Sequence, residues 1–172
     1  MIPDIASGLI AMKYGFQGLN YATVSACASS SNALIDALTY IRVGYADVIV
    51  AGGSEAPVTI AGVGGFNAMH ALSTRNDDPN TASRPFDRDR DGFVLGEGAG
   101  SLIIEEYEHA VNRGAKIYAE VIGGGLSCDA YHMTAPHPDG RGAIKVMKNC
   151  LQDANIQLSL IHISEPTRPL II

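Results

Sequence analysis

The sequence predicts a layered α/β fold, and two observations carry that prediction. Apolar runs of strand length alternate along the chain with segments of helical period, and the strand-like runs cover residues 21–24, 47–51, 101–104 and 117–122. After its first residue, Asp47, the run 47–51 is continuously apolar, which is typical of a strand buried on both faces. Strands that alternate with helices favour a sheet that is at least partly parallel and covered by helices on both sides.

Helix start and stop signals place the intervening helices. Asp4 and Gly15 frame a helix over residues 4–14, and Gly44 ends a long helix over residues 28–43. A helix over 60–72 is weakened by three glycines, one over 105–113 stops at Gly114, and the last, over 143–154, is amphipathic. The strand over 117–122 is closed by three consecutive glycines.

Composition restricts the class of protein. The chain has 172 residues, of which 47% are hydrophobic and 17% charged, so it should be globular and well buried around one sizeable core. A net charge of −6 argues against a general nucleic-acid binder and against a protein that binds anionic membranes. The N-terminal residues show neither a basic leader nor a long apolar stretch, so we expect no membrane insertion.

The three cysteines, Cys27, Cys128 and Cys150, are poor evidence for a disulfide framework. They fit a reducing cytoplasm better. Residues 73–92 form a long polar loop with four arginines and five aspartates and no amphipathic period. We expect most of these charges to pair with one another at the surface, although loops of this length are often functional.

Cys27 is the leading candidate for chemistry. The strand-like run 21–24 stops at a cluster of small residues, and helical spacing begins directly after the cysteine: Leu34 and Leu38 share one face, Asn32 and Asp36 another. A cysteine at such a switch can form a nucleophile elbow, in which the amides of the helix N-terminus favour the thiolate. The alternative is a small buried thiol in a core.

Two other motifs are weaker. The glycine-rich run 96–100 resembles a dinucleotide loop, but it precedes a strand, whereas a dinucleotide fingerprint follows one. Cys128, His132 and His137 could be zinc ligands, but a second well-spaced ligand pair is missing, so we expect no metal. A cysteine nucleophile normally needs a histidine partner, and spacing assigns none of the five histidines to that role.

Five motifs give the chain a resemblance to a known family. The segment VSACASSS at 24–31 resembles the active-site cysteine segment of the β-ketoacyl-acyl-carrier-protein synthases. Three further segments agree with it in order: DVIVAGGSE at 47–55, ALSTRN at 71–76 and SRPFDRDRDGFVLGEGAG at 83–100. YHMTAP at 131–136 is similar to the elongating synthases of bacterial type II fatty acid synthesis. The resemblance runs from about residue 2 to residue 157.

The resemblance implies a thiolase-like fold with layers in the order αβαβα, of which this chain carries the later part of the N-terminal half and the start of the C-terminal half. It implies a cytoplasmic homodimer that needs no cofactor and takes its substrates from acyl carrier protein. Cys27 matches the acyl-accepting cysteine, and its backbone amide an oxyanion donor. Phe66 and Phe93 match positions that line the acyl pocket or flank the catalytic centre. Asp129, His132 and Thr134 match a loop beside the pantetheine channel.

The chain departs from the family at two places. His70 stands where many relatives carry an arginine that contacts the carrier protein. Residues 158–172 resemble translated sequencing-adapter sequence, so we expect a partial synthase domain over 1–157 followed by a tail foreign to the family. The tail replaces the segments that supply both catalytic histidines, and His162 within it should not be assigned as a base. We therefore expect apolar strands without their covers and no condensation by this chain alone.

Three alternatives stay open. The first is a ketosynthase of polyketide or aryl-polyene synthesis. The second is a non-catalytic partner that binds carrier protein, although such partners typically lack the cysteine that is present here at Cys27. The third is a chain without a stable fold.

Overall fold

The computed structural model describes residues 2–157, which divide into two compact units. Of the described residues, the first unit comprises 2–52 and 101–157, and the second comprises 53–100. Within the described residues, the helices are all too short or too polar to cross a membrane.

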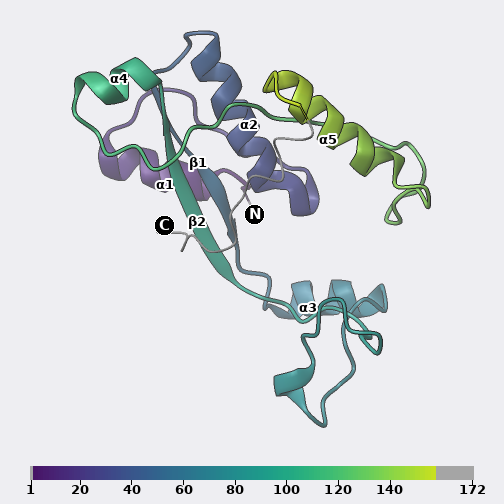
Figure 1. Ribbon diagram of the computed structural model, residues 1–172. Helices are drawn as coiled ribbons and strands as arrows, with labels where there is room; N and C mark the ends of the chain where they lie inside the picture. The colour runs from purple at the N-terminus through teal and green to yellow at the C-terminus, as the bar shows by residue number, and fades with distance from the viewer. Residues whose placement is uncertain (1, 158–172) are drawn as a thin grey trace. The chain divides into compact units, whose positions relative to one another are not determined.

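Four of the five α-helices of the described residues belong to the first unit (Figure 1). They are α1 (Ile5–Tyr14), α2 (Ser29–Arg42), α4 (Tyr107–Asn112) and α5 (Arg141–Asp153). Each lies within two residues of a helix that the sequence predicts, so those predictions are confirmed. Gly15, Gly44 and Gly114 follow their helices with φ near +70°, a conformation that glycine adopts without steric cost.

The sheet of the described residues has two strands, β1 (Val48–Glu55) and β2 (Gly98–Glu105). The Glu106 amide, just after β2, donates to the Asp47 carbonyl, just before β1, at 2.8 Å. The end of one strand therefore meets the start of the other, and the pair runs antiparallel (Figure 1). The prediction of a partly parallel sheet is wrong for this pair, and the parallel pairing that the structure shows is one isolated bridge between Leu72 and Phe93.

Two predicted strands do not form. Residues 21–24 and 117–122 belong to no strand of the structure. A strand exists only where a neighbouring backbone completes its ladder, and the described residues offer neither segment such a neighbour. Apolar residues of high β propensity are therefore not sufficient for a strand here.

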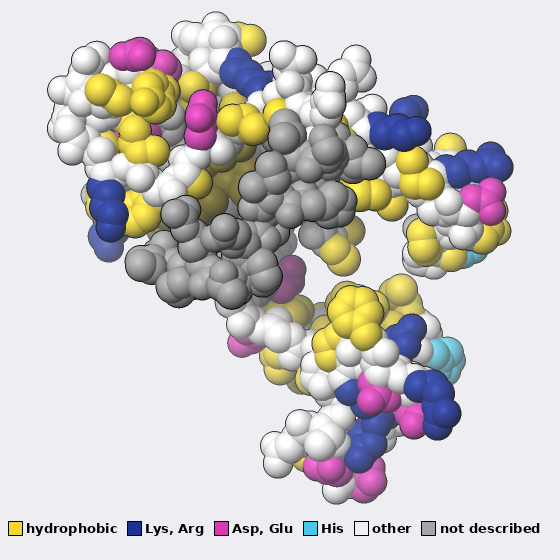
Figure 2. All heavy atoms as spheres, viewed as in Figure 1, with side chains coloured by type: hydrophobic (Ala, Val, Ile, Leu, Met, Phe, Trp, Pro, Cys, Tyr) yellow, Lys and Arg dark blue, Asp and Glu magenta, His cyan; other side chains and the backbone are white. Residues whose placement is uncertain are grey.

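The core is much smaller than the composition predicts. The buried hydrophobic residues of the described part are Ala37, Leu38, Ala51, Ala82 and Ala110. Leu102 and Ile103 of β2 are 54% and 68% exposed, so the prediction of a sheet covered on both faces is wrong. The prediction of apolar strands without covers is confirmed instead, and Figure 2 shows hydrophobic side chains in patches on the visible surface.

Helices α2 and α5 are joined at their C-terminal ends through a glycine-rich segment. Arg42 Nη1 donates to both carboxylate oxygens of Asp153, at 3.0 and 2.8 Å, and Arg42 Nη2 donates to the Ile122 carbonyl at 2.6 Å. The Gly124 amide donates to Asp153 Oδ2 at 2.8 Å. A Cβ on Gly125 would overlap the backbone of α5, because the Cys150 amide nitrogen would lie 2.7 Å from it. The segment therefore needs glycine to pass this close to the helix.

The second unit contains α3 (Ile60–Ala68) and a polar loop. The predicted helix over 60–72 ends at Ala68, and His70 adopts a left-handed φ of 53°, which α-helical backbone does not allow. Asp91 organises the loop by accepting from Ser73 Oγ at 2.6 Å, the Thr74 amide at 2.9 Å and Arg84 Nη2 at 3.1 Å. These bonds, that of Ser73 first, lower the pKa of Asp91 to about 2. The prediction that loop charges pair with one another is confirmed for Arg75–Asp78, Arg84–Asp91 and Arg88–Asp89.

Candidate active site

Cys27 lies in a turn that leads directly into α2. The turn is a short 3₁₀ helix, Ala26–Ala28, and the Cys27 side chain is exposed. Ala26 has a φ of 51°, a left-handed conformation that costs a residue with a Cβ about 1–2 kcal/mol. The predicted strand before the cysteine is absent, but the sharp turn into a helix that an elbow requires is present. The alternative of a small buried thiol is wrong for Cys27.

Short hydrogen bonds from α2 hold this turn. The Ser25 amide donates to Ser29 Oγ at 2.9 Å, and Ser29 Oγ donates to the Ala26 carbonyl at 2.8 Å. Asn32 Nδ2, one turn further along α2, donates to Ser25 Oγ at 2.7 Å. The residues on both sides of Cys27 are therefore fixed to the first two turns of the helix.

A second set of contacts holds the segment that leads to the turn. Tyr21 Oη and Thr23 Oγ1 both donate to Asp36 Oδ2, at 3.2 and 3.1 Å. The Tyr21 ring packs edge-on against Tyr40, with 6.4 Å between the ring centroids. Burial, followed by the hydrogen bond to Tyr40 and the charge of Asp36, raises the pKa of Tyr21 above its ordinary value. Tyr21 therefore stays a neutral hydrogen-bond donor at neutral pH.

Phe66 and Phe93 meet in the second unit. Their rings are perpendicular, with centroids 6.1 Å apart, as aromatic pairs prefer. The Phe93 amide donates to the Ala71 carbonyl at 2.8 Å, and the Ser73 amide donates to the Phe93 carbonyl at 2.9 Å. Gly92 has a φ of +151°, and a Cβ there would lie 2.5 Å from the Leu72 carbonyl carbon, so only glycine fits beside the pair.

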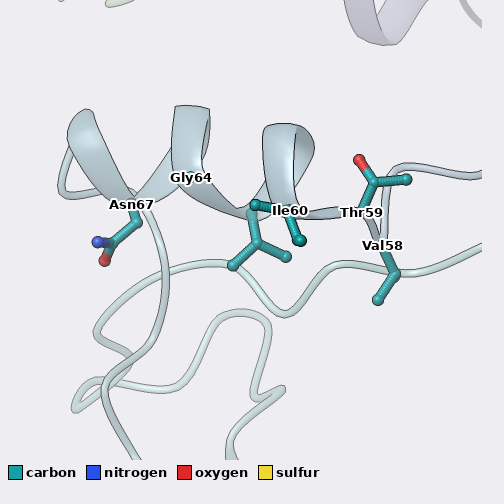
Figure 3. Close-up of a pocket in the computed structure, with 6 residues that line it drawn as sticks. Val58, Thr59, Ile60, Gly64 and Asn67 are labelled. Atoms are coloured by element: carbon teal, nitrogen blue, oxygen red, sulfur yellow. The ribbon is translucent and has the colours of Figure 1, made fainter.

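An open hollow of about 430 Å³ lies along α3 (Figure 3). Its lining residues are Val58, Thr59, Ile60, Val63, Gly64 and Asn67. Ile60 is 97% exposed at its edge, and neither Phe66 nor Phe93 lines it. The hollow is therefore an uncovered apolar helix face and not an extension of the aromatic pair.

Asp129, His132 and Thr134 share one loop of the first unit. Asp129 Oδ2 accepts from the His137 amide at 2.9 Å and Asp129 Oδ1 from the Tyr131 amide at 3.3 Å. These bonds, that of His137 first, lower the pKa of Asp129 below its ordinary value. His132 Nδ1 lies 3.2 Å from the Thr134 amide nitrogen, which donates to it. The neutral tautomer of His132 that fits this bond carries its proton on Nε2.

The structure pairs Phe66 with Phe93 and places Asp129, His132 and Thr134 in one loop, and among the described residues it places no base in contact with Cys27. Within residues 2–157, no hydrogen bond joins Cys27 to a histidine, and His162 lies outside them. No group of three or more histidine, cysteine or acidic side chains suited to a metal ion occurs in the described part. Ser29, Asn32 and Asp36 carry no role that the sequence predicts, although the helix face shared by Asn32 and Asp36 is a signal of one.

Comparisons with known proteins identify the family of the chain. Residues 1–110 match the model of the β-ketoacyl synthase N-terminal domain, and residues 118–166 match that of the C-terminal domain. The chain is 52% identical to the 3-oxoacyl-acyl-carrier-protein synthase 2 of Synechocystis over 161 residues, which are 94% of this chain and 39% of that protein. It therefore spans well under half the length of this relative.

Solved structures give the same result. One is a type II PKS acyl-carrier protein in complex with its ketosynthase bound to the hexaketide, with a TM-score of 0.85 and 42% identity over 90% of this chain and 38% of that one. Another is a β-ketoacyl synthase from Burkholderia phymatum, with a TM-score of 0.83 and 40% identity over 91% of this chain and 38% of that one. The fold is therefore an incomplete thiolase-like α/β fold. The chain belongs to the β-ketoacyl synthase family.

Proposed function

We propose that the protein carrying this chain condenses an acyl group with a malonyl unit in fatty acid elongation. The Cys27 thiolate attacks the acyl thioester on acyl carrier protein, a new thioester forms at Sγ, and the carrier thiol leaves. Malonyl carrier protein then loses CO₂, and the carbanion displaces Cys27 Sγ to give the 3-oxoacyl product. The observation that supports this most is the exposed Cys27 on the turn into α2, in a chain 52% identical to a 3-oxoacyl-acyl-carrier-protein synthase.

The other predicted residues take supporting roles in this proposal. The Cys27 backbone amide, at the start of a helix, donates to the oxyanion of the tetrahedral intermediate. The Phe66–Phe93 pair lines the site of the acyl chain. Asp129, His132 and Thr134 lie beside the pantetheine arm, where the ionised Asp129 orders the loop through the His137 and Tyr131 amides. No cofactor is needed, because both substrates arrive as thioesters.

The 172-residue chain alone should accept the acyl group but not complete condensation. The two histidines that polarise the malonyl thioester belong to segments that this chain does not match, and each such donor is worth about 2–4 kcal/mol. The whole protein would act as a cytoplasmic homodimer with acyl carrier protein as its partner. The foreign tail that we expect over 158–172, including His162, lies outside the described residues.

A polyketide synthase function is the second candidate. It is favoured by the 42% identity to the ketosynthase in the type II PKS complex. The 52% identity to the Synechocystis enzyme favours fatty acid synthesis. The two candidates share the chemistry at Cys27 and differ in the substrate.

The test is acyl transfer from a fatty acyl carrier protein, followed by intact-mass measurement of the chain. We expect one acyl group on the parent chain and on the Cys128→Ser control, and none on Cys27→Ser. Added malonyl carrier protein should give no 3-oxoacyl product. A parent chain that stays unmodified, or acylation that survives Cys27→Ser, would contradict the proposed function.

A further inference from the structure

The turn that carries Cys27 combines a strained residue with an unusual way of holding it. Ala26 has a φ of 51°, on the left-handed side of backbone space, where a Cβ is disfavoured. A residue stays in such a conformation only when its surroundings impose it. The thiol direction of Cys27 depends on this conformation, because Ala26 is the residue immediately before it.

The hydrogen bonds of the turn converge on both sides of Ala26. Ser29 Oγ binds the Ala26 carbonyl at 2.8 Å and accepts from the Ser25 amide at 2.9 Å. Asn32 Nδ2 then binds Ser25 Oγ at 2.7 Å, the shortest of the three bonds, and it does so in a partly buried position. The Ser25 side chain is therefore fixed from the second turn of α2, and it cannot follow a relaxation of Ala26 without breaking that bond.

The helix itself supports a special role for these residues. Helix α2 begins with the residues SSSN, and neither serine nor asparagine favours a helix interior, because both compete with the backbone for hydrogen bonds. Ala28, the N-cap residue, makes no side-chain cap bond. The polar side chains at 29 and 32 are thus directed to the cysteine turn and not to capping of the helix.

We propose that Asn32 is a positioning residue for the Cys27 thiol: through Ser25 it holds Ala26 in the left-handed conformation and fixes the thiol at the N-terminus of α2. The inference rests on the proposed function, since it takes Cys27 as the nucleophile. Asn32 makes no contact with substrate in this role. It acts through Ser25 and Ala26.

The test measures alkylation of Cys27 by iodoacetamide, resolved by peptide mass spectrometry, with exposed Cys128 of the same molecule as the reference. Access does not limit the reaction at Cys27, which is already exposed, so its rate reports how the helix N-terminus activates the thiol. We expect Asn32→Ala to slow Cys27 alkylation about fivefold, the effect of one lost hydrogen bond, and to leave the Cys128 rate unchanged.

The background Ala26→Gly separates positioning from general damage. Glycine adopts a left-handed φ without strain, so it needs no clamp. In that background Asn32→Ala should slow the alkylation of Cys27 by about twofold or less. The effects of the two substitutions on this rate are then non-additive. Equal slowing in both backgrounds, or no slowing in either, would overturn the proposal.

Three further variants keep the test decisive. Asn149 lies on α5, and its side-chain amide donates a comparable hydrogen bond to the Leu126 carbonyl at 2.8 Å. Asn149→Ala removes this bond and should leave Cys27 alkylation unchanged. Ser25→Ala should slow Cys27 alkylation as much as Asn32→Ala does. Ser25→Thr, which keeps the hydroxyl, should react at the rate of the parent chain. Amide hydrogen exchange over residues 25–29 should quicken in Asn32→Ala, and unchanged exchange there would count against the clamp.

These readouts are independent of acyl transfer. If Cys27 accepts no acyl group but the alkylation pattern holds, the proposed function fails and the positioning role of Asn32 stands. If acyl transfer occurs and Asn32→Ala changes neither alkylation nor exchange, the proposed function stands and the positioning role fails.

Discussion

The two ends of α2 are held in different ways. At the N-terminal end, hydroxyl and amide groups and the Asp36 carboxylate, all within fifteen residues of one another along the chain, hold the Cys27 turn and the segment before it. At the C-terminal end, Arg42 binds Asp153 and Ile122, which lie 111 and 80 residues further along the chain. The Cys27 turn is therefore held by local contacts, while the far end of the same helix joins the regions that match the two family domains.

The largest effect should come from the close approach at the far end. Gly125→Ala places a Cβ against the backbone of α5, and overpacking of this kind costs about 1–3 kcal/mol. Urea unfolding should show a clearly lower midpoint than in the parent chain. Gly18→Ala is the matched control, because a Cβ there meets nothing within 4 Å. Equal midpoints for the two variants would show that the segment does not pass α5 so closely.

A smaller effect should come from the charge on Asp153. The Gly124 amide, and then Arg42, lower the pKa of Asp153 below its ordinary value, so its carboxylate stabilises the fold above about pH 4 and less as pH falls through the lowered pKa. Asp153→Asn should therefore be less stable than the parent at pH 7, and the difference should shrink toward pH 3. Asparagine can still accept from Gly124, so the variant isolates the charge. If the stability difference between Asp153→Asn and the parent chain does not change with pH, the charge of Asp153 does not stabilise the C-terminal end of α2.

The smallest effect should come from the N-terminal end. Tyr21→Phe removes the 3.2 Å hydrogen bond to Asp36 but keeps the ring against Tyr40. Loss of one neutral donor at a partly exposed position should lower the free energy of unfolding by about 0.5 kcal/mol. Because Tyr21 stays neutral, the difference should not vary between pH 6 and 9 in urea titrations. A loss as large as that of Gly125→Ala would contradict the division of the helix into a weakly and a strongly held end.

Local sequence signals predicted much of this molecule. Gly15, Gly44 and Gly114 end their helices as expected, and the small residues around Cys27 mark its turn. The predictions of strands over 21–24 and 117–122 were wrong because strand pairing depends on a backbone distant in the sequence. A local pattern holds no information about that partner. The clamp at Asn32 escaped prediction for a related reason. Its role appears only once the left-handed φ of Ala26 is known.

The central claim is that Cys27, and neither Cys128 nor Cys150, is the acyl acceptor. Trypsin separates the three thiols, because lysine or arginine at 13, 42, 116, 141 and 148 places each cysteine on its own peptide. The decisive measurement is peptide-resolved acylation after exposure of the parent chain to a fatty acyl carrier protein. We predict the acyl mass on the peptide 14–42 alone. Acyl mass spread over all three cysteine peptides, or absent from 14–42, would contradict the account.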